Sequence, residues 1–144
     1  MPEALTDIGH VIQLAIAPVF MLTAIGTVLN VLAGRLGRAV DRRRVLVAAL
    51  PRLDVGVADV ARAEVGFEIR RIRLIYIAIT MAVLSALLIC LLIALAFIDA
   101  FTVANFAKLI AALFILAMVA LIASLTIFLR EIFISINSPR APVV

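Results

Sequence analysis

Hydrophobic residues are grouped along the chain in three long runs that contain no Asp, Glu, Lys or Arg. The runs cover residues 8–34, 74–98 and 109–129, so they are 27, 25 and 21 residues long. A helix of about 20 apolar residues spans the hydrocarbon core of a bilayer. Because lipid offers no hydrogen-bond partners, the backbone N–H and C=O groups of a span must bond within the protein, as they do in a helix. The pattern therefore predicts an all-α integral membrane protein with three transmembrane helices.

The segments outside the runs are residues 1–7, 35–73, 99–108 and 130–144. In residues 35–73, apolar residues recur at roughly helical spacing on both sides of Pro51, interrupted by Arg43 and Glu64. Proline lacks a backbone donor and disfavours helix at the preceding residue, so Pro51 should end the first helix. We expect a helical hairpin whose apolar edges are Leu36, Val40, Val47 and Leu50, and then Leu53, Val57, Val60 and Phe67.

Residues 67–138 contain neither glycine nor proline. Nothing local therefore interrupts a helix that enters the second run from the hairpin, and one helix from about residue 53 to 98 is expected. The short segment 99–108 should join the second and third spans as an antiparallel hairpin, with Asn105 as a plausible N-cap. A close-packing edge on the third span is indicated by its small residues, which are Ala112, Ala117, Ala120 and Ser124.

The distribution of positive charge predicts the orientation. Residues 35–73 hold ten of the thirteen Lys and Arg residues. Short loops rich in Lys and Arg stay in the cytoplasm. The hairpin and the tail 130–144 should therefore be cytoplasmic, and residues 1–7 and 99–108 should lie outside.

Composition narrows the chemistry further. The chain is 67% hydrophobic, far above the usual share in soluble domains, and carries a formal charge of +4. A single cysteine, Cys90, excludes an intramolecular disulfide and is expected to be a buried, inert thiol. The runs contain no acid or Lys/Arg base, and the chain has no phosphate-binding loop or Cys/His cluster. We therefore expect no catalytic, cofactor-binding or metal site and no enzymatic activity; an enzyme would have to rely on His10 or Cys90.

The first run is the most polar of the three. Its residues Thr23, Thr27, Asn30 and Gly34 share one helical face, which Gly26 borders. Such a face either packs closely against another helix or lines a pore or ligand surface. Pro18 lies in the same run, where a fixed kink is one interpretation and a hinge or an exposed carbonyl is the other.

Arginines cluster near the predicted membrane border of the hairpin. We expect contacts with anionic lipid headgroups or a protein partner from Arg42, Arg43, Arg44, Arg70, Arg71 and Arg73. The spacing of Asp59 with Arg62, and of Glu68 with Arg71, also allows ion pairs along a helix. No nucleic-acid recognition module accompanies this charge, so a nucleic-acid partner is not expected.

Several strings resemble a family of small bacterial inner-membrane proteins, catalogued as domain of unknown function twenty-seven twenty-one. They are IQLAIAPVF at 12–20, Gly26 with Asn30, VDR at 40–42, RRIRLI at 70–75, LSALL at 84–88 and FLRE at 128–131. The resemblance covers about residues 8–135, although residues 55–63 carry more valine and alanine than expected. It implies three membrane helices and a cytoplasmic hairpin in the bacterial inner membrane, and it brings no established activity.

Two hypotheses about function follow. In the first, the protein self-assembles as a homo-oligomer, and Thr23, Thr27 and Asn30 line a small pore. In the second, it is a non-conducting accessory or scaffold subunit whose hairpin binds a protein partner or anionic lipid. The oligomeric state and the position of Asn30 within it separate the two.

Overall fold

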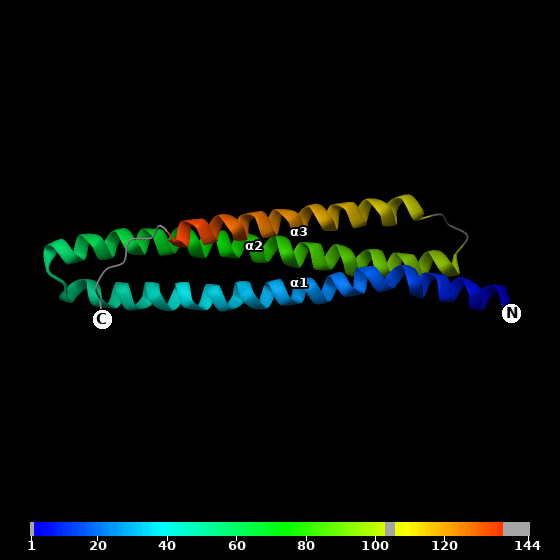
Figure 1. Ribbon diagram of the computed structural model, residues 1–144, viewed down its shortest axis with the longest axis horizontal. Helices are drawn as coiled ribbons and strands as arrows, with labels where there is room; N and C mark the ends of the chain where they lie inside the picture. Colours follow the sequence, from blue (N-terminus) through cyan, green and yellow to red (C-terminus); the bar gives the residue numbers. More distant parts are fainter. Residues whose placement is uncertain (1, 103–105, 137–144) are drawn as a thin grey trace. The chain divides into compact units, whose positions relative to one another are not determined.

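A computed structural model of the chain describes residues 2–102 and 106–136. Within these residues the protein is all-helical, with α1 (Pro2–Ala49), the 3-10 helix η1 (Leu50–Arg52), α2 (Val55–Phe101) and α3 (Ala107–Ile136), as Figure 1 shows. Three helical segments are long and apolar enough to cross a membrane: Ala15–Arg52, which runs from α1 into η1, Val55–Asp99 of α2 and Ala107–Ile136 of α3. The prediction of an all-α chain with three potential transmembrane helices is confirmed.

The helix ends follow the local sequence. α1 stops at Ala49, and Pro51 lies inside η1, as predicted. α2 begins at Val55 and runs unbroken to Phe101, which confirms the expected long helix. The proposed N-cap Asn105 lies outside the described residues. Next to it, the Phe106 amide donates a hydrogen bond of 2.9 Å to Asp99 Oδ1, which ties the start of α3 to the end of α2.

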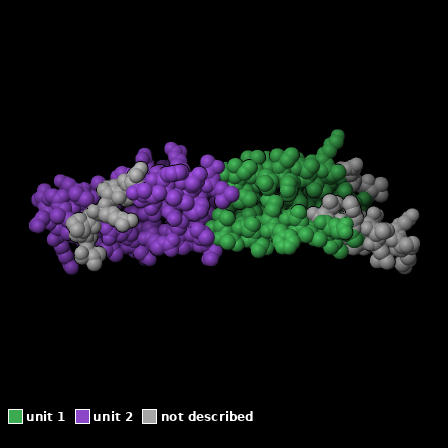
Figure 2. Space-filling model, viewed as in Figure 1, with its two compact units in different colours: residues 1–29, 81–123 green, residues 30–80, 124–144 purple. Residues whose placement is uncertain are grey.

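The chain forms two compact units, coloured separately in Figure 2. Unit 1 consists of residues 1–29 and 81–123, and unit 2 consists of residues 30–80 and 124–144. Each unit contains a segment of all three α-helices. The two units are described in turn.

Unit 1 has an apolar core with very small residues between α2 and α3. The core residues are Ile25, Ala82, Ile89, Leu92, Leu113 and Ala117. Ser85 Oγ donates a 2.7 Å hydrogen bond to the carbonyl of Ala117, so the two backbones approach closely there. Ala117 and Ala120 are buried as predicted, whereas Ala112 is exposed. Cys90 is also exposed, so the prediction of a buried thiol is wrong.

Unit 2 packs α1 against α2 through Leu46 and Ala61. It also joins α3 to α2, where Ser124 Oγ donates a 2.7 Å hydrogen bond to the carbonyl of Ala78. Val47 and Val60, assigned to the apolar edges of the hairpin, are exposed. That part of the prediction is wrong. On α1 the buried position is Leu46, next to Val47, and on α2 the positions around Val60 that are buried are Ala58, Ala61 and Glu64.

Candidate functional site

Three glutamates are almost completely buried in unit 2. The exposed fractions are 2% for Glu64, 3% for Glu68 and 0% for Glu131. A carboxylate withdrawn from water costs several kcal/mol unless it is paired and hydrogen-bonded. The partners of these three side chains therefore decide how unit 2 is held together.

Glu131 of α3 joins all three helices of unit 2. Arg35 of α1 donates a 2.9 Å hydrogen bond from Nε to its Oε2, and Arg35 Nη2 lies 2.9 Å from the same oxygen in an ion pair. Arg71 of α2 donates from Nε to the other oxygen, Oε1, at 3.0 Å. The Arg35 guanidinium also lies 5.5 Å from the centre of the Phe128 ring, within the range of a cation–π contact.

The two glutamates of α2 are paired in the same way. Arg71 Nη1 donates to Glu68 Oε1 at 2.7 Å, so Arg71 connects Glu68 with Glu131. Arg42 binds Glu64 through two parallel bonds, Nε to Oε1 at 2.8 Å and Nη2 to Oε2 at 3.2 Å. Such fork-shaped pairing is the strongest arginine–carboxylate geometry. We call these six residues, Arg35, Arg42, Glu64, Glu68, Arg71 and Glu131, the ion cluster.

The three positive and three negative side chains of the ion cluster balance in charge. Among the described residues, Glu68 Oε2 is the one buried side-chain oxygen or nitrogen without a hydrogen-bond partner. Groups of three or more His, Cys, Asp or Glu side chains that could hold a metal ion are absent from residues 2–102 and 106–136. The arrangement thus fits a structural clamp between helices.

The cluster forms because its members occupy the seam positions of the helices. Buried or half-buried residues of α2 alternate by three and four: Ala61, Glu64, Glu68, Arg71, Ile75 and Ala78. On α1, Arg35 and Arg42 fall between the buried Leu32, Ala39 and Leu46 with the same spacing, and on α3 Glu131 follows Ser124 by seven. This is the heptad pattern of helices packed as in a coiled coil. Polar groups in such a seam fix the register.

Three members of the ion cluster lie near the ends of the uncharged runs. Arg35 directly follows the run 8–34, Arg71 lies three positions before the run 74–98, and Glu131 lies two positions after the end of the run 109–129. Since Glu131 bonds both arginines, these three borders lie together in unit 2.

Some of these pairs were predicted and others were missed. The pairs of Asp59 with Arg62 and of Glu68 with Arg71 are present at 2.6 Å and 2.7 Å, which confirms the spacing argument. The long-range pairs of Glu131 and Glu64 were missed. The signal that could have revealed them is the heptad spacing, because it places the charged residues Glu64, Glu68 and Arg71 on the same helical face as the buried Ala61 and Ala78.

The structure separates the arginines assigned to lipid or partner contacts. Arg42 and Arg71 are half-buried and bind glutamates of their own chain. The other four, Arg43, Arg44, Arg70 and Arg73, are exposed. The contacts of these four with lipid or protein stay a prediction.

The predicted polar face of α1 is exposed along its whole length, at Thr23, Gly26, Thr27, Asn30 and Gly34. Thr27 Oγ1 donates to the Thr23 carbonyl of its own helix at 3.1 Å. A Cβ atom added at Gly26 would meet nothing within 4 Å. No helix of the described chain therefore covers this face around Gly26.

Two further features of α1 bear on that face. Within the described part of the chain, the side-chain amide of Asn30 makes no hydrogen bond. α1 continues through Pro18, which is buried. The kink assigned to Pro18 stays a prediction.

Comparison with known proteins identifies the family. Neither a curated protein nor a solved structure matches the chain at a significant level. The sequence profile of one family, described as protein of unknown function (DUF2721), matches residues 15–141. That range includes α1 from Ala15, all of α2 and α3, and every residue of the ion cluster. The chain therefore belongs to the DUF2721 family.

Proposed function

We propose that this chain is a non-enzymatic, multi-pass protein of the bacterial inner membrane that self-assembles through the exposed face of α1. The arginine-rich segment 35–73 supports an orientation with the helical hairpin and the C-terminal tail in the cytoplasm and the N-terminus outside. The observation that carries self-assembly is Asn30, an exposed amide inside an uncharged run of 27 residues.

Asn30 needs a partner once α1 lies in lipid. An amide without a hydrogen bond in hydrocarbon costs several kcal/mol, whereas an amide bonded across two membrane helices contributes about 0.6–2 kcal/mol. Gly26 and Gly34 lie one turn before and one turn after Asn30, so a second helix can approach its backbone closely.

A second copy of the same chain is the occupant that fits this face best. In a two-fold contact between α1 helices, Asn30 of each copy meets the same residue of the other, and each amide offers both donors and acceptors. Such a contact satisfies both polar groups at once without any further protein.

The mass of the full chain in a neutral detergent tests self-assembly. Native mass spectrometry should show a defined homo-oligomer, and Asn30→Leu should raise the dissociation constant about threefold to thirtyfold, as expected for an interhelical amide bond. The control Thr80→Val changes another exposed polar position, whose hydroxyl binds the Tyr76 carbonyl of its own helix, and should leave the mass unchanged. A strictly monomeric wild-type chain would contradict the proposal.

Conduction is a separate property of the assembled protein. The hydroxyls of Thr23 and Thr27 together with the Asn30 amide supply the polar groups that a water-filled path requires. If they line a pore, Asn30→Leu should lower the single-channel conductance in planar bilayers, measured on oligomers of unchanged mass. An unchanged conductance assigns Asn30 to helix packing alone.

The alternative is a non-conducting scaffold whose hairpin binds a partner protein or anionic lipid. The exposed hairpin residues Arg43, Arg44 and Val47 favour it, because they combine charge with apolar surface. Replacing Arg43 and Arg44 with Gln should weaken capture of a partner protein by the hairpin and leave the oligomer mass unchanged.

A further inference from the structure

We infer that unit 2 carries a ring of four exposed arginines, Arg38, Arg70, Arg73 and Arg130, that binds the headgroup phosphates of anionic phospholipids. The inference rests on the membrane insertion proposed above, but it does not require self-assembly.

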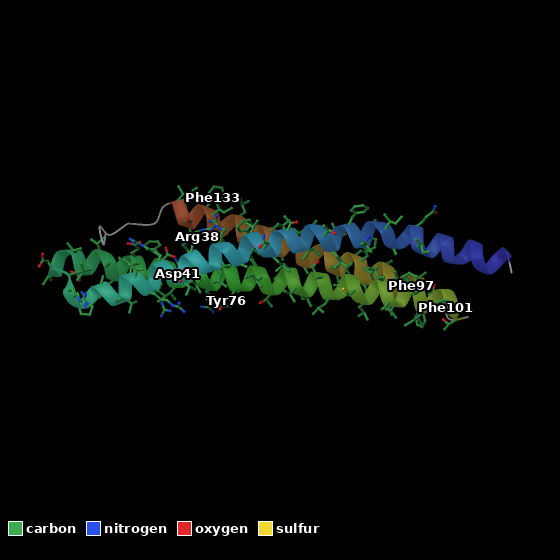
Figure 3. All side chains as sticks on the ribbon, turned by 90° about the horizontal axis from the view of Figure 1, so that it is seen from below. Arg38, Asp41, Tyr76, Phe97, Phe101 and Phe133 are labelled. Carbon is green, nitrogen blue, oxygen red and sulfur yellow. The ribbon has the colours of Figure 1, made fainter. Side chains whose placement is uncertain are left out.

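The ion cluster places these four residues at one level of unit 2. Arg70 and Arg73 flank Arg71 on α2, Arg38 lies one turn after Arg35 on α1, and Arg130 precedes Glu131 on α3. Because Glu131 binds Arg35 and Arg71, the three helices are fixed against each other at this point. In Figure 3, Arg38 of α1, Tyr76 of α2 and Phe133 of α3 are labelled at a similar position along the length of the helices.

Within the part of the chain that the structure describes, no carboxylate neutralises the charges of the ring. All four side chains are exposed, and none forms an ion pair within residues 2–102 and 106–136. The arginines of the ion cluster, in contrast, bind buried carboxylates. Four unpaired cations around three helices therefore remain available for anions from outside the chain.

The surroundings of the ring match the headgroup level of a membrane. Arg73 directly precedes the uncharged run 74–98, and Arg130 directly follows the run 109–129. Exposed apolar side chains continue on that side, with Tyr76 and Leu129 among them. Tyrosine and arginine at the end of a span are typical of the border between hydrocarbon and phosphate. Cations spread over three helices suit a leaflet that presents many phosphates.

Binding of individual lipids to the purified full chain tests the ring. We expect native mass spectrometry in a neutral detergent to give a dissociation constant about tenfold lower for phosphatidylglycerol than for phosphatidylcholine, since each arginine near an anionic surface contributes up to about fivefold. The variant Arg38→Gln, Arg70→Gln, Arg73→Gln, Arg130→Gln should reduce this preference to within about twofold.

A control variant carries the same change in charge elsewhere in the same unit. Arg43→Gln, Arg44→Gln, Arg52→Gln, Arg62→Gln alters four other exposed arginines and should keep the preference. The inference is overturned if the ring variant keeps the preference, if the control loses it equally, or if millimolar inorganic phosphate displaces the lipid. Circular dichroism checks that each variant folds. If the fourfold ring variant does not fold, the double variant Arg70→Gln, Arg73→Gln takes its place and should lower the preference for phosphatidylglycerol severalfold. The oligomer mass in the same spectra tests self-assembly separately.

Discussion

Replacing Glu131 with glutamine is expected to destabilise the folded protein by about 3–5 kcal/mol, the usual cost of breaking a buried ion pair by removing one partner. Glu131 is fully buried and receives bonds from Arg35 and Arg71, which are 23% and 15% exposed. An amide has one acceptor oxygen and no charge, so Arg35 loses its carboxylate partner and Arg71 keeps only its ion pair with Glu68. Reversible unfolding of the full chain in mixed detergent micelles measures the change in free energy.

Asp59→Asn is the matched control, because it makes the same carboxylate-to-amide change in a short ion pair. Asp59 and Arg62 are both exposed, and exposed pairs contribute about 0–1 kcal/mol. We expect a change below about 1 kcal/mol there. Equal losses for the two variants would contradict a clamping role for Glu131.

Ala117→Leu is expected to cost about 1–3 kcal/mol, because a larger side chain must enter a filled contact between α2 and α3. Ala117 is fully buried, and its carbonyl accepts the 2.7 Å hydrogen bond from Ser85. A leucine would push the helices apart and break that bond. The same unfolding titration gives the loss of stability.

Ala112→Leu makes the identical substitution on an exposed part of α3. Away from packed contacts, such a change usually stays within about 0.5 kcal/mol. If Ala112→Leu is as costly as Ala117→Leu, the close contact in unit 1 does not depend on small residues.

The sequence predicted the helices because their signals are local. Uncharged runs, the lack of glycine and proline in residues 67–138, and Pro51 each act within a few residues. The small residues Ala117 and Ser124 also predicted a close-packing edge on α3, since small side chains let membrane helices approach closely.

The buried face of the hairpin was not predictable from apolar residues alone. Glu64 interrupts the apolar edge in the sequence, yet it is one of the buried residues, while Val60 is exposed. The reason is that Arg42 neutralises Glu64 from another helix, a compensation invisible to a pattern that reads one helix at a time.

The same limit applies to the candidate sites. Arg71 looked like a surface cation because its partner Glu131 lies 60 residues away in sequence. The exposed face of α1 was visible from helical spacing, but spacing could not say whether a helix of the same chain covers it. The orientation in the membrane and the pairing of copies involve molecules outside the chain, and for that reason they remain proposals.

Disulfide cross-linking in isolated membranes tests self-assembly through α1 most directly. The wild-type chain has one cysteine, Cys90, exposed on α2, and it serves as the reference position. The variant Thr27→Cys, Cys90→Ser moves the thiol to the same face of α1, three residues before Asn30, and keeps the Asn30 side chain. On mild oxidation, we predict a covalent dimer for this variant and much less for the wild type. A variant that stays monomeric while Cys90 cross-links readily would contradict assembly through this face.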